Sequence, residues 1–311
     1  MRSSKKAEIH IVALETGHLS KKVVSGGDIL LEKMFPHLPK WIKLSVIVPK
    51  IGTGHWKKHT NVVIHALPPN IFDSTSNKVL VFVVYLWRSY QTYLKLLRLE
   101  FDLIYSSTNV LPDILPAYLF KVINHKKYWI ARIHHLIQQP AKRPGNFWLN
   151  FGAFLIQSLT IKLIKSANLT IVLNNSVYHQ LEKLGFPKNQ LRILGAGADF
   201  KKISKIKTKQ LQFDGVFVGR LHITKGVFDL IPIWSQITNT VPEAKLAIVG
   251  EGRPETIRKL KEEIKSHNLE KNFFLLGHLS SEKLYQTLKK SRVFLFTDHE
   301  AGFGLAAAEA A

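Results

Sequence analysis

The chain has 311 residues, enough for two ordinary domains, and its apolar content of 46% and charged content of 21% are typical of globular proteins with a sizeable core. It has no cysteine, which excludes disulfides, cysteine-based zinc sites and cysteine nucleophiles. Residues 1–200 carry +16 of the net charge of +22, whereas residues 211–311 carry +1, so only the first half is expected to meet a polyanion.

Residues 1–200 alternate strand-like and helix-like segments. Strands are predicted at residues 8–14, 43–48, 61–67, 101–106, 128–133, 168–173 and 191–194. Helices are predicted after the glycine pair at 26–27 and at residues 79–99, 110–123, 147–161 and 176–184. Pro116 predicts a kink or a later start of its helix. The lysine-rich residues 201–210 predict a linker, which divides the chain into domains at 1–205 and 206–311.

The second half alternates more strictly. A strand at 216–218 ends at Gly219, and Lys225 and Gly226 are predicted to open the next helix. Further strands are predicted at 245–249, 272–276 and 293–296, and helices at 254–267 and 281–290. This alternation predicts parallel sheets covered on both faces, with ligands in the cleft between the strand carboxyl ends of the two domains.

Two apolar stretches raise the question of a membrane. Residues 79–87 are wholly apolar or aromatic but far shorter than the roughly 20 residues that a span needs. Residues 144–161 carry no charge but include several amide and hydroxyl side chains. Both are predicted to be buried or interfacial helices, and a span at the second stays open as the minority alternative.

The segment 214–226 is the first candidate for a ligand site. A helix that starts at the carboxyl end of a strand offers unpaired N–H groups and the positive end of its dipole, which favours an anion. Arg220 and Lys225 in the same turn point to a diphosphate. The alternative is a surface loop with two solvated cations.

Two other classes of function compete for these features. Gly250-Glu251-Gly252 is like the start of a dinucleotide fingerprint, which keeps an NAD-dependent oxidoreductase as an alternative. However, Glu255 occupies the third glycine position, and the Glu251 carboxylate would repel a pyrophosphate. The basic charge suggests a nucleic-acid-binding protein, but no aromatic–basic interleaving supports it, so no nucleic-acid partner is expected.

Metal ligation has only weak support. No Asp-x-Asp pair occurs, and the nearest match, residues 298–300 (D-H-E), is a weak metal candidate.

The end of the chain, T-D-H-E-A-G-F-G-L-A-A-A-E-A-A, resembles the donor-site signature of the retaining family-4 (group 1) glycosyltransferases. V-F-V-G-R-L-x-x-x-K-G, L-A-I-V-G-E-G and F-L-L-G-H-L-S resemble other segments of that family, as do S-G-G-D, R-I-H-H and G-A-G-A-D in the first half. The resemblance implies an α/β fold with two Rossmann-like doubly wound domains facing a cleft, called GT-B. Because the family continues beyond the position of Ala311, the second domain is expected to be incomplete and the chain truncated.

The resemblance also implies roles for individual residues. Arg220 and Lys225 would hold the donor diphosphate and stabilise it as leaving group. His134 would lie close to the transferred sugar, and Glu300 would face it as a second catalytic residue. The other expected donor contacts are Gly26 and Gly27 at the phosphates, Gly277, His278 and Leu279 beside the base, Gly302, Phe303, Gly304 and Leu305 at the sugar and phosphate, and Glu309 at the ribose.

The spacing of the two glutamates leaves one assignment open. Glu300 and Glu309 are nine positions apart, whereas the family spaces its pair eight apart. Either the loop carries one extra residue and Glu300 still reaches the donor, which we favour because loops absorb insertions, or Ala301 leaves the position vacant and another group substitutes.

The resemblance thus implies a metal-independent, hexosyltransferase-type enzyme of glycan biosynthesis. It would move a sugar from a UDP- or GDP-sugar, with retention at the anomeric carbon, to a sugar or lipid-linked acceptor such as a cell-envelope glycan. No cofactor besides the donor is expected. The basic first half, residues 142–143 and the apolar helix at 147–161 predict a cytoplasmic protein that binds peripherally to the inner, anionic face of a membrane.

Overall fold

The computed structural model describes residues 8–17, 26–73, 75, 77–143, 145–208, 210–299 and 303–311. It divides into two compact units, Met1–Gly195 (unit 1) and Ala196–Ala311 (unit 2). The division precedes the predicted boundary at 205. Residues 206–208 are tied to unit 2: Lys289 Nζ donates to Ile206 O (2.7 Å), and Thr208 Oγ1 donates to Lys289 O (3.3 Å).

Unit 1 is built on a seven-stranded sheet in which all neighbouring strands are parallel. Across the sheet the order is β3 (Val62–Leu67), β2 (Ile42–Pro49), β1 (Ile9–Leu14), β4 (Leu103–Ser106), β5 (Tyr128–Ile133), β6 (Leu169–Val172) and β7 (Leu191–Ile193). The order reverses between β1 and β4, and such a reversal leaves room for a ligand at the strand carboxyl ends.

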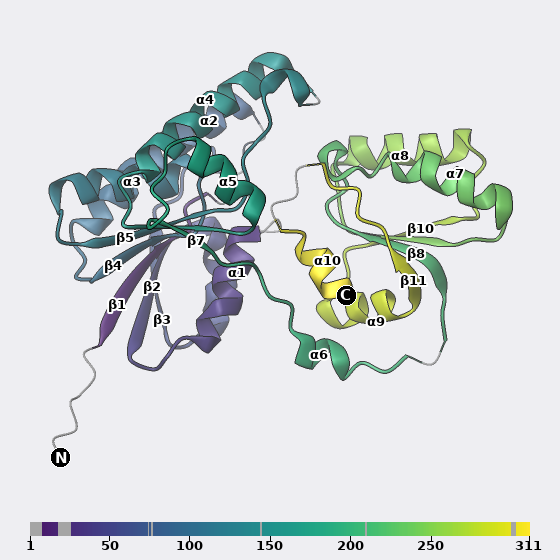
Figure 1. Ribbon diagram of the computed structural model, residues 1–311, viewed down its shortest axis with the longest axis horizontal. Coiled ribbons are helices and arrows are strands. Elements are labelled where there is room, and N and C mark those ends of the chain that lie inside the picture. The colour runs from purple at the N-terminus through teal and green to yellow at the C-terminus, as the bar shows by residue number, and fades with distance from the viewer. Residues whose placement is uncertain are drawn as a thin grey trace. The chain divides into compact units, whose positions relative to one another are not determined.

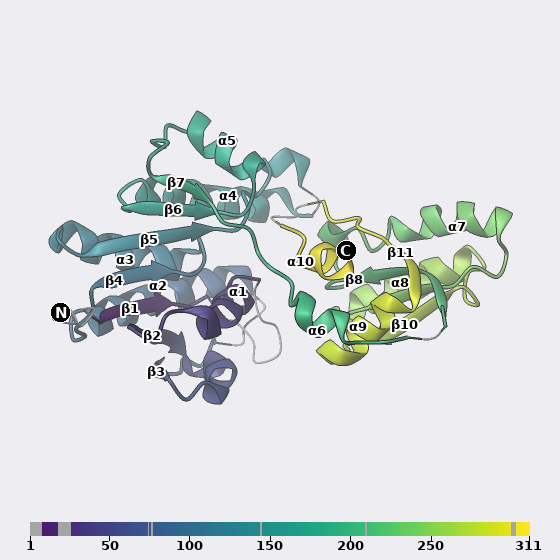
Figure 2. The same cartoon turned by 60° about the horizontal axis from the view of Figure 1, so that its bottom comes forward.

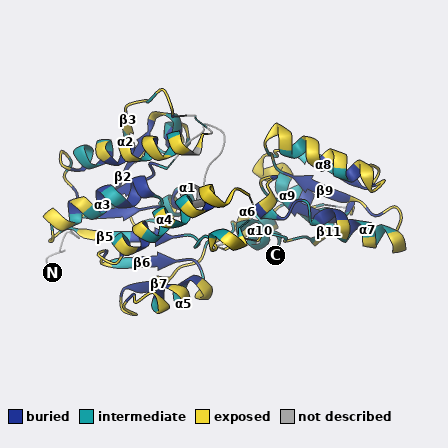
Figure 3. Cartoon of the chain, turned by 90° about the horizontal axis from the view of Figure 1, so that it is seen from above, coloured by how far each residue is buried: buried dark blue, intermediate teal, exposed yellow. Residues whose placement is uncertain are grey.

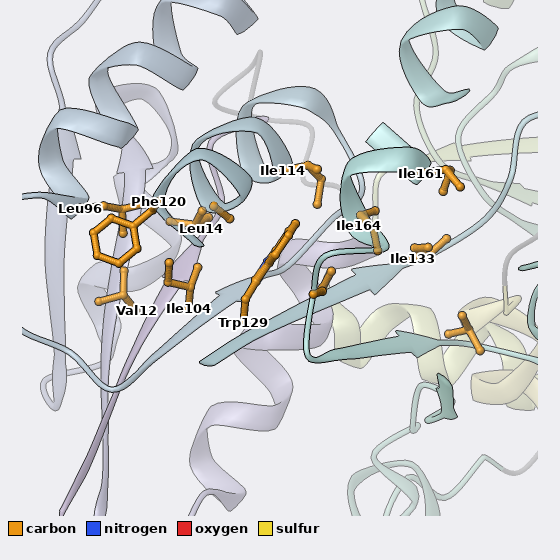
Figure 4. Packing of buried hydrophobic residues seen from close by; sticks show 14 of the residues in the cluster. Val12, Leu14, Leu96, Ile104, Ile114, Phe120, Trp129, Ile133, Ile161 and Ile164 are labelled. Atoms are coloured by element: carbon orange, nitrogen blue, oxygen red, sulfur yellow. The ribbon is translucent and has the colours of Figure 1, made fainter. Parts of the chain in front are cut away.

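Helices cover both faces of this sheet, as the alternation of the sequence predicts (Figure 1). On one face lie α1 (Gly26–Met34), η1 (Phe35–His37) and η2 (Lys50–Lys58). On the other lie α2 (Lys78–Leu96), α3 (Leu111–Ile123), α4 (Phe147–Ile164), which follows η3 (Pro140–Lys142), and α5 (Asn175–Lys183). Successive residues of β1 point to opposite faces of the sheet. Val12 and Leu14 belong to the core beneath α2–α5, and Ala13 belongs to the core on the other face. Figure 4 shows the first of these cores, in which Trp129 of β5 is fully buried.

Unit 2 repeats this plan with four parallel strands in the order β10 (Phe273–Gly277), β9 (Leu246–Val249), β8 (Phe213–Val218) and β11 (Ser291–Phe294). Helices α7 (Leu230–Thr240) and α8 (Pro254–Ser266) pack on one face, and α9 (Ser281–Lys289) packs on the other. Three short elements complete the unit: α6 (Phe200–Ser204), η4 (Ile223–Lys225) and α10 (Leu305–Ala310). In both units the buried residues follow the strands and the inner helix faces (Figure 3).

Two local predictions are wrong, and one of two alternatives for a third position is excluded. The helix after β8 begins at Leu230 and not beside Gly226, because Gly226 adopts a left-handed conformation (φ +65°) that ends η4. Of the two alternatives predicted for Pro116, a kink or a later start of the helix, the later start is excluded, because α3 starts at Leu111 and contains Pro116. Part of the predicted linker is helix α6, whose first turn is capped by the Asp199 carboxylate accepting from Lys202 N (3.1 Å).

A buried ion pair holds the start of unit 1 together. Arg88 of α2 is 1% exposed, and its guanidinium donates to Asp73 Oδ1 (2.7 Å) and to the backbone oxygen of Thr16 (2.9 Å). These bonds fix the segment after β1 and the segment before α2 to one helix. Taking away one partner of such a pair leaves a buried charge uncompensated.

We therefore expect Arg88→Met to lower the free energy of unfolding by about 3 kcal/mol or more. The matched control is Arg98→Met, because Arg98 is exposed just after α2 and a surface substitution costs at most about 0.5 kcal/mol. Urea denaturation of both variants measures the difference. Equal stabilities would show that the Arg88 pair contributes nothing.

Candidate active site

Backbone hydrogen bonds join the carboxyl ends of the three strands β8, β9 and β10. Gly219, after β8, donates its N–H to Val249 O (3.0 Å), and Gly250, after β9, donates to Gly277 O (2.8 Å). The loops that leave these strands therefore start from fixed positions at one edge of the sheet, which is where ligands of parallel α/β sheets bind.

This junction requires residues without side chains. Gly250 has φ +140°, and an added Cβ would lie 1.9 Å from the backbone oxygen of Gly219. At Gly252 the added Cβ would lie 2.6 Å from Leu221 O, and these two residues form a bridge. Packing against residues 219–221 thus accounts for the two glycines of the dinucleotide-like motif, and Glu251 between them is exposed.

The segment after β11 packs on the turn that carries Lys225. Thr297 Oγ1 donates to Lys225 O (3.1 Å), and the backbone N–H of His299 donates to Thr224 O (3.0 Å). Gly226 lies so close that an added Cβ would be 2.1 Å from Thr297 O. Two segments about 70 residues apart in sequence are thereby held together at the same edge of the sheet.

The two cations of the predicted diphosphate site differ in their surroundings. The Lys225 ammonium, with a side chain 28% exposed, forms an ion pair with the carboxylate of Asp298. Arg220 is exposed, and its guanidinium has no partner within the described residues. Arg220 can meet an anion directly, whereas an anion that binds Lys225 has to share its ammonium with Asp298.

Two members of the weak metal candidate at 298–300 are bound to protein groups. Asp298 contacts Lys225, and His299 Nε2 bonds to Asp229 Oδ2 (2.5 Å). Glu300 lies outside the described residues. Over the described ranges no group of three or more His, Asp or Glu side chains is arranged to hold a metal ion.

The last helix brings Glu309 to α9. Tyr285 of α9 donates its hydroxyl to Glu309 Oε1 (3.3 Å), and burial together with the Glu309 charge raises the pKa of Tyr285 to about 12. Tyr285 therefore remains protonated and orients the carboxylate predicted to bind a ribose. Leu305 is the first residue of α10, after Gly304 in a left-handed conformation (φ +76°) and the exposed Phe303. Gly302 lies outside the described residues.

The predicted base-side residues follow β10. Gly277 is left-handed (φ +66°), and an added Cβ would meet no described atom within 4 Å, so open space adjoins it. His278 is exposed, and the half-buried Leu279 packs on the smaller core of unit 2. These residues share the sheet edge with Gly250, which donates to Gly277 O.

In unit 1 the predicted catalytic histidine follows β5. His134 Nε2 lies 2.8 Å from the backbone oxygen of Ser107, so Nε2 carries the proton and Nδ1 is the acceptor nitrogen. Burial lowers the pKa of His134 to about 4, against the raising effect of the bond to Ser107. The ring is therefore neutral near pH 7. The other predicted residues of this unit, Gly26 and Gly27, are the first two residues of α1.

A buried polar network beside His134 was not predicted from the sequence. The Asp113 carboxylate accepts from Thr16 N (2.7 Å), from Thr16 Oγ1 (2.8 Å) and from Thr108 Oγ1 (2.5 Å). It thereby joins the carboxyl ends of β1 and β4, where the strand order reverses. The available signals were an acid in the first turn of α3 and an arginine, Arg88, in the middle of the largely apolar helix α2.

Glycine substitutions test the strand junction. We expect Gly250→Ala to cost about 3 kcal/mol or more in unfolding free energy, since it adds a steric clash to backbone strain. Gly277→Ala is the control, because its φ is also positive but its Cβ has space, so it should cost only about 1–2 kcal/mol. Thermal and urea unfolding compare them, and equal costs would contradict the close approach to Gly219.

The pKa of His134 predicts a dependence of stability on pH. The pKa of His134 in the folded protein, about 4, lies below the ordinary 6.5. Its contribution to the free energy of unfolding is therefore complete above pH 6.5 and is lost as the pH falls towards 4. Across this window the wild type should lose roughly 2–3 kcal/mol more than His134→Gln, which has no such proton to bind. Urea denaturation at several pH values checks this, and parallel pH profiles would refute it.

Comparison with known proteins identifies the class of protein. Residues 198–311 match the family model described as glycosyl transferases group 1. An uncharacterized glycosyltransferase of Methanocaldococcus jannaschii is 21% identical over 304 residues, which are 94% of this chain and 73% of that protein.

Solved structures share the fold at low sequence identity. HepE of Anabaena, in complex with UDP and glucose, matches with a TM-score of 0.69 and 16% identity, over 97% of this chain and 78% of its own. Sucrose-phosphate synthase of Thermosynechococcus elongatus matches with a TM-score of 0.71 and 15% identity, over the same shares of the two chains. The chain is therefore a glycosyltransferase with the GT-B fold, and its residues 198–311 match the family model of group 1 of these enzymes.

Proposed function

We propose that this glycosyltransferase takes its sugar from a nucleoside-diphosphate sugar, with retention at the anomeric carbon and without a metal or other cofactor. The observation that carries the proposal is the position of Arg220 and Lys225. Both lie in the turn after β8, and the ends of β9 and β11 fix that turn at the carboxyl edge of the sheet. HepE, which has the same fold, was solved with UDP, which supports a uridine or related nucleotide as the ligand.

The chemistry of the two cations suits a diphosphate leaving group. As the bond from the sugar to the diphosphate breaks, negative charge grows on the diphosphate oxygens, and positioned cations stabilise that charge more than they stabilise the intact donor. Arg220 can offer two parallel N–H donors to phosphate oxygens, and Lys225 offers a compact ammonium. This is the role that a divalent cation fills in other enzymes.

The remaining predicted residues have roles consistent with their surroundings. Tyr285 orients the Glu309 carboxylate, which we propose accepts the ribose hydroxyls of the donor. His134 is held neutral, so near pH 7 we propose that it acts as a hydrogen-bonding group at the transferred sugar and not as a general acid. The acceptor that we propose is a sugar or lipid-linked glycan.

Binding of UDP, GDP and NAD to the purified chain tests the donor site. Each charge-assisted contact to a phosphate is worth roughly 1.5–3 kcal/mol, so Arg220→Ala should weaken nucleoside-diphosphate binding by about tenfold or more. Lys225→Ala should cost more, because it also leaves the Asp298 carboxylate facing the diphosphate, and Lys225→Ala/Asp298→Asn should recover part of that loss.

Lys261→Ala removes an exposed lysine of α8 and serves as the control, with unchanged affinity expected. Wild-type affinity in both site variants, or tighter binding of NAD than of UDP and GDP, would refute the assignment. Retention is tested separately by proton NMR of the anomeric configuration of the first product.

A further inference from the structure

Helix α2 buries several polar side chains and exposes many apolar ones. The side that it buries carries Arg88, Ser89 and Thr92 as well as the apolar Val84 and Leu96. The side that it exposes is apolar and follows a helical spacing: Val79, Phe82, Val83, Leu86, Trp87 and Tyr90, each between 38% and 67% exposed. A surface helix in water normally shows the opposite arrangement. We therefore expect the outer stripe of α2 to contact an apolar partner and not water.

Helix α4 shows a similar pattern. It buries Asn150 and Thr160 beside Ile161 and Ile164, and it exposes an apolar stripe of Phe147, Trp148, Phe151, Leu155 and Leu159. Trp148 is 75% exposed, and its ring lies 5.5 Å from that of Phe147 and 6.5 Å from that of Phe151, centroid to centroid. Among the described helices, α4 alone has the length and apolar composition of a membrane span, with 22% of that window buried in unit 1.

The two stripes belong to one surface. Helix α3 packs between α2 and α4, and all three cover the same face of the sheet (Figures 1 and 2). Since both helices follow parallel strands, β3 and β5, both begin at the carboxyl edge of the sheet. Figure 3 shows exposed residues along the outer sides of both helices. We call the stripes, with the basic residues that border them, the α2–α4 face.

The charged residues within α2 and α4 are all basic. Between Asp113 and Glu182 the chain has no Asp or Glu but has eight basic residues, and α2 contains no acid either. Lys142 is exposed just before α4, and Lys162 is exposed three residues after Leu159, continuing the apolar stripe. A surface of apolar and aromatic side chains on helices whose charged residues are all basic is complementary to an anionic lipid bilayer.

We propose that the α2–α4 face docks unit 1 on an anionic membrane, with both helices lying in the plane of the interface. Apolar side chains enter the boundary between headgroups and acyl chains, Trp and Tyr lie at headgroup depth, and the lysines contact lipid phosphates. The carboxyl edge of the sheet, which carries His134, then lies near the membrane surface. This last step rests on the proposed glycosyl transfer: a sheet edge near the membrane surface is well placed to receive an acceptor that is attached to a lipid.

Vesicle flotation tests the docking with the whole chain. The protein should float with vesicles of equal parts phosphatidylglycerol and phosphatidylcholine, but much less with pure phosphatidylcholine. In about 1 M salt, where the Debye length falls to about 3 Å, binding to the anionic vesicles should drop steeply. Equal binding to neutral vesicles, or none to either, overturns the proposal. Resistance to carbonate extraction overturns it in favour of a span at α4.

Matched variants locate the contact. Lys142→Gln/Lys162→Gln should weaken binding by about fivefold for each charge removed, whereas Lys201→Gln/Lys202→Gln, which removes the same charge from α6, should leave it unchanged. Trp148→Gln should weaken binding roughly tenfold, and Phe200→Gln, at a residue that is also 75% exposed, should have no effect. Equal effects of a variant and its control would overturn the proposal.

Two further readouts distinguish membrane docking from self-association of the chain and from damage to the donor site. Vesicles should shift the tryptophan emission to shorter wavelength, less so in Trp148→Phe. All five variants should keep wild-type UDP binding, so a failure of docking is distinguishable from a failure of the donor site. A homodimer in solution that Trp148→Gln dissociates, with no vesicle binding, would replace the membrane by a second copy of the chain.

Discussion

The proposed donor site of this enzyme depends on how closely two backbone segments approach each other after β8 and β9. Gly250 lies against the backbone oxygen of Gly219 at a distance that no side chain permits, and it needs a positive φ of +140° to do so. This contact fixes where the chain leaves β8, and hence where Arg220 and Lys225 begin their turn. The segment after β11 then closes on that turn through Thr297 and His299. A pre-formed turn needs no reordering when a diphosphate binds, which favours affinity and catalysis alike.

In unit 1, buried polar side chains fix the loops that follow the strands. Asp113 joins the ends of β1 and β4, and Arg88 ties the segment after β1 to Asp73. The inner side of α2 thus buries the polar groups Arg88, Ser89 and Thr92 beside Val84 and Leu96, and an apolar stripe remains on its outer side. Exposing this apolar stripe to water costs free energy, and contact of the stripe with lipid would remove that cost.

The sequence was a good guide to the regular elements, because β-branched runs bounded by glycine or polar turns are local signals. It predicted β5 and the start of α8 to the residue, and it indicated parallel sheets with helices on both faces. Its errors came from backbone conformation: nothing local distinguishes Gly226, whose left-handed φ delays α7 until Leu230, from a glycine that opens a helix. Pairs distant in sequence were also out of reach. Lys225 with Asp298, or Thr16 with Asp113, can be found only once the strand order places their loops side by side.

Hydrogen–deuterium exchange of the whole chain with and without UDP would test the central claim, that the carboxyl edge of unit 2 binds the diphosphate of the donor. We predict that saturating UDP slows exchange in peptides covering residues 219–229 and 277–279, because a ligand there restrains loops that already share hydrogen bonds with the strand ends. Peptides from the outer sides of α7 and α8 should exchange as before. Protection confined to unit 1, or none at saturation, would contradict the account.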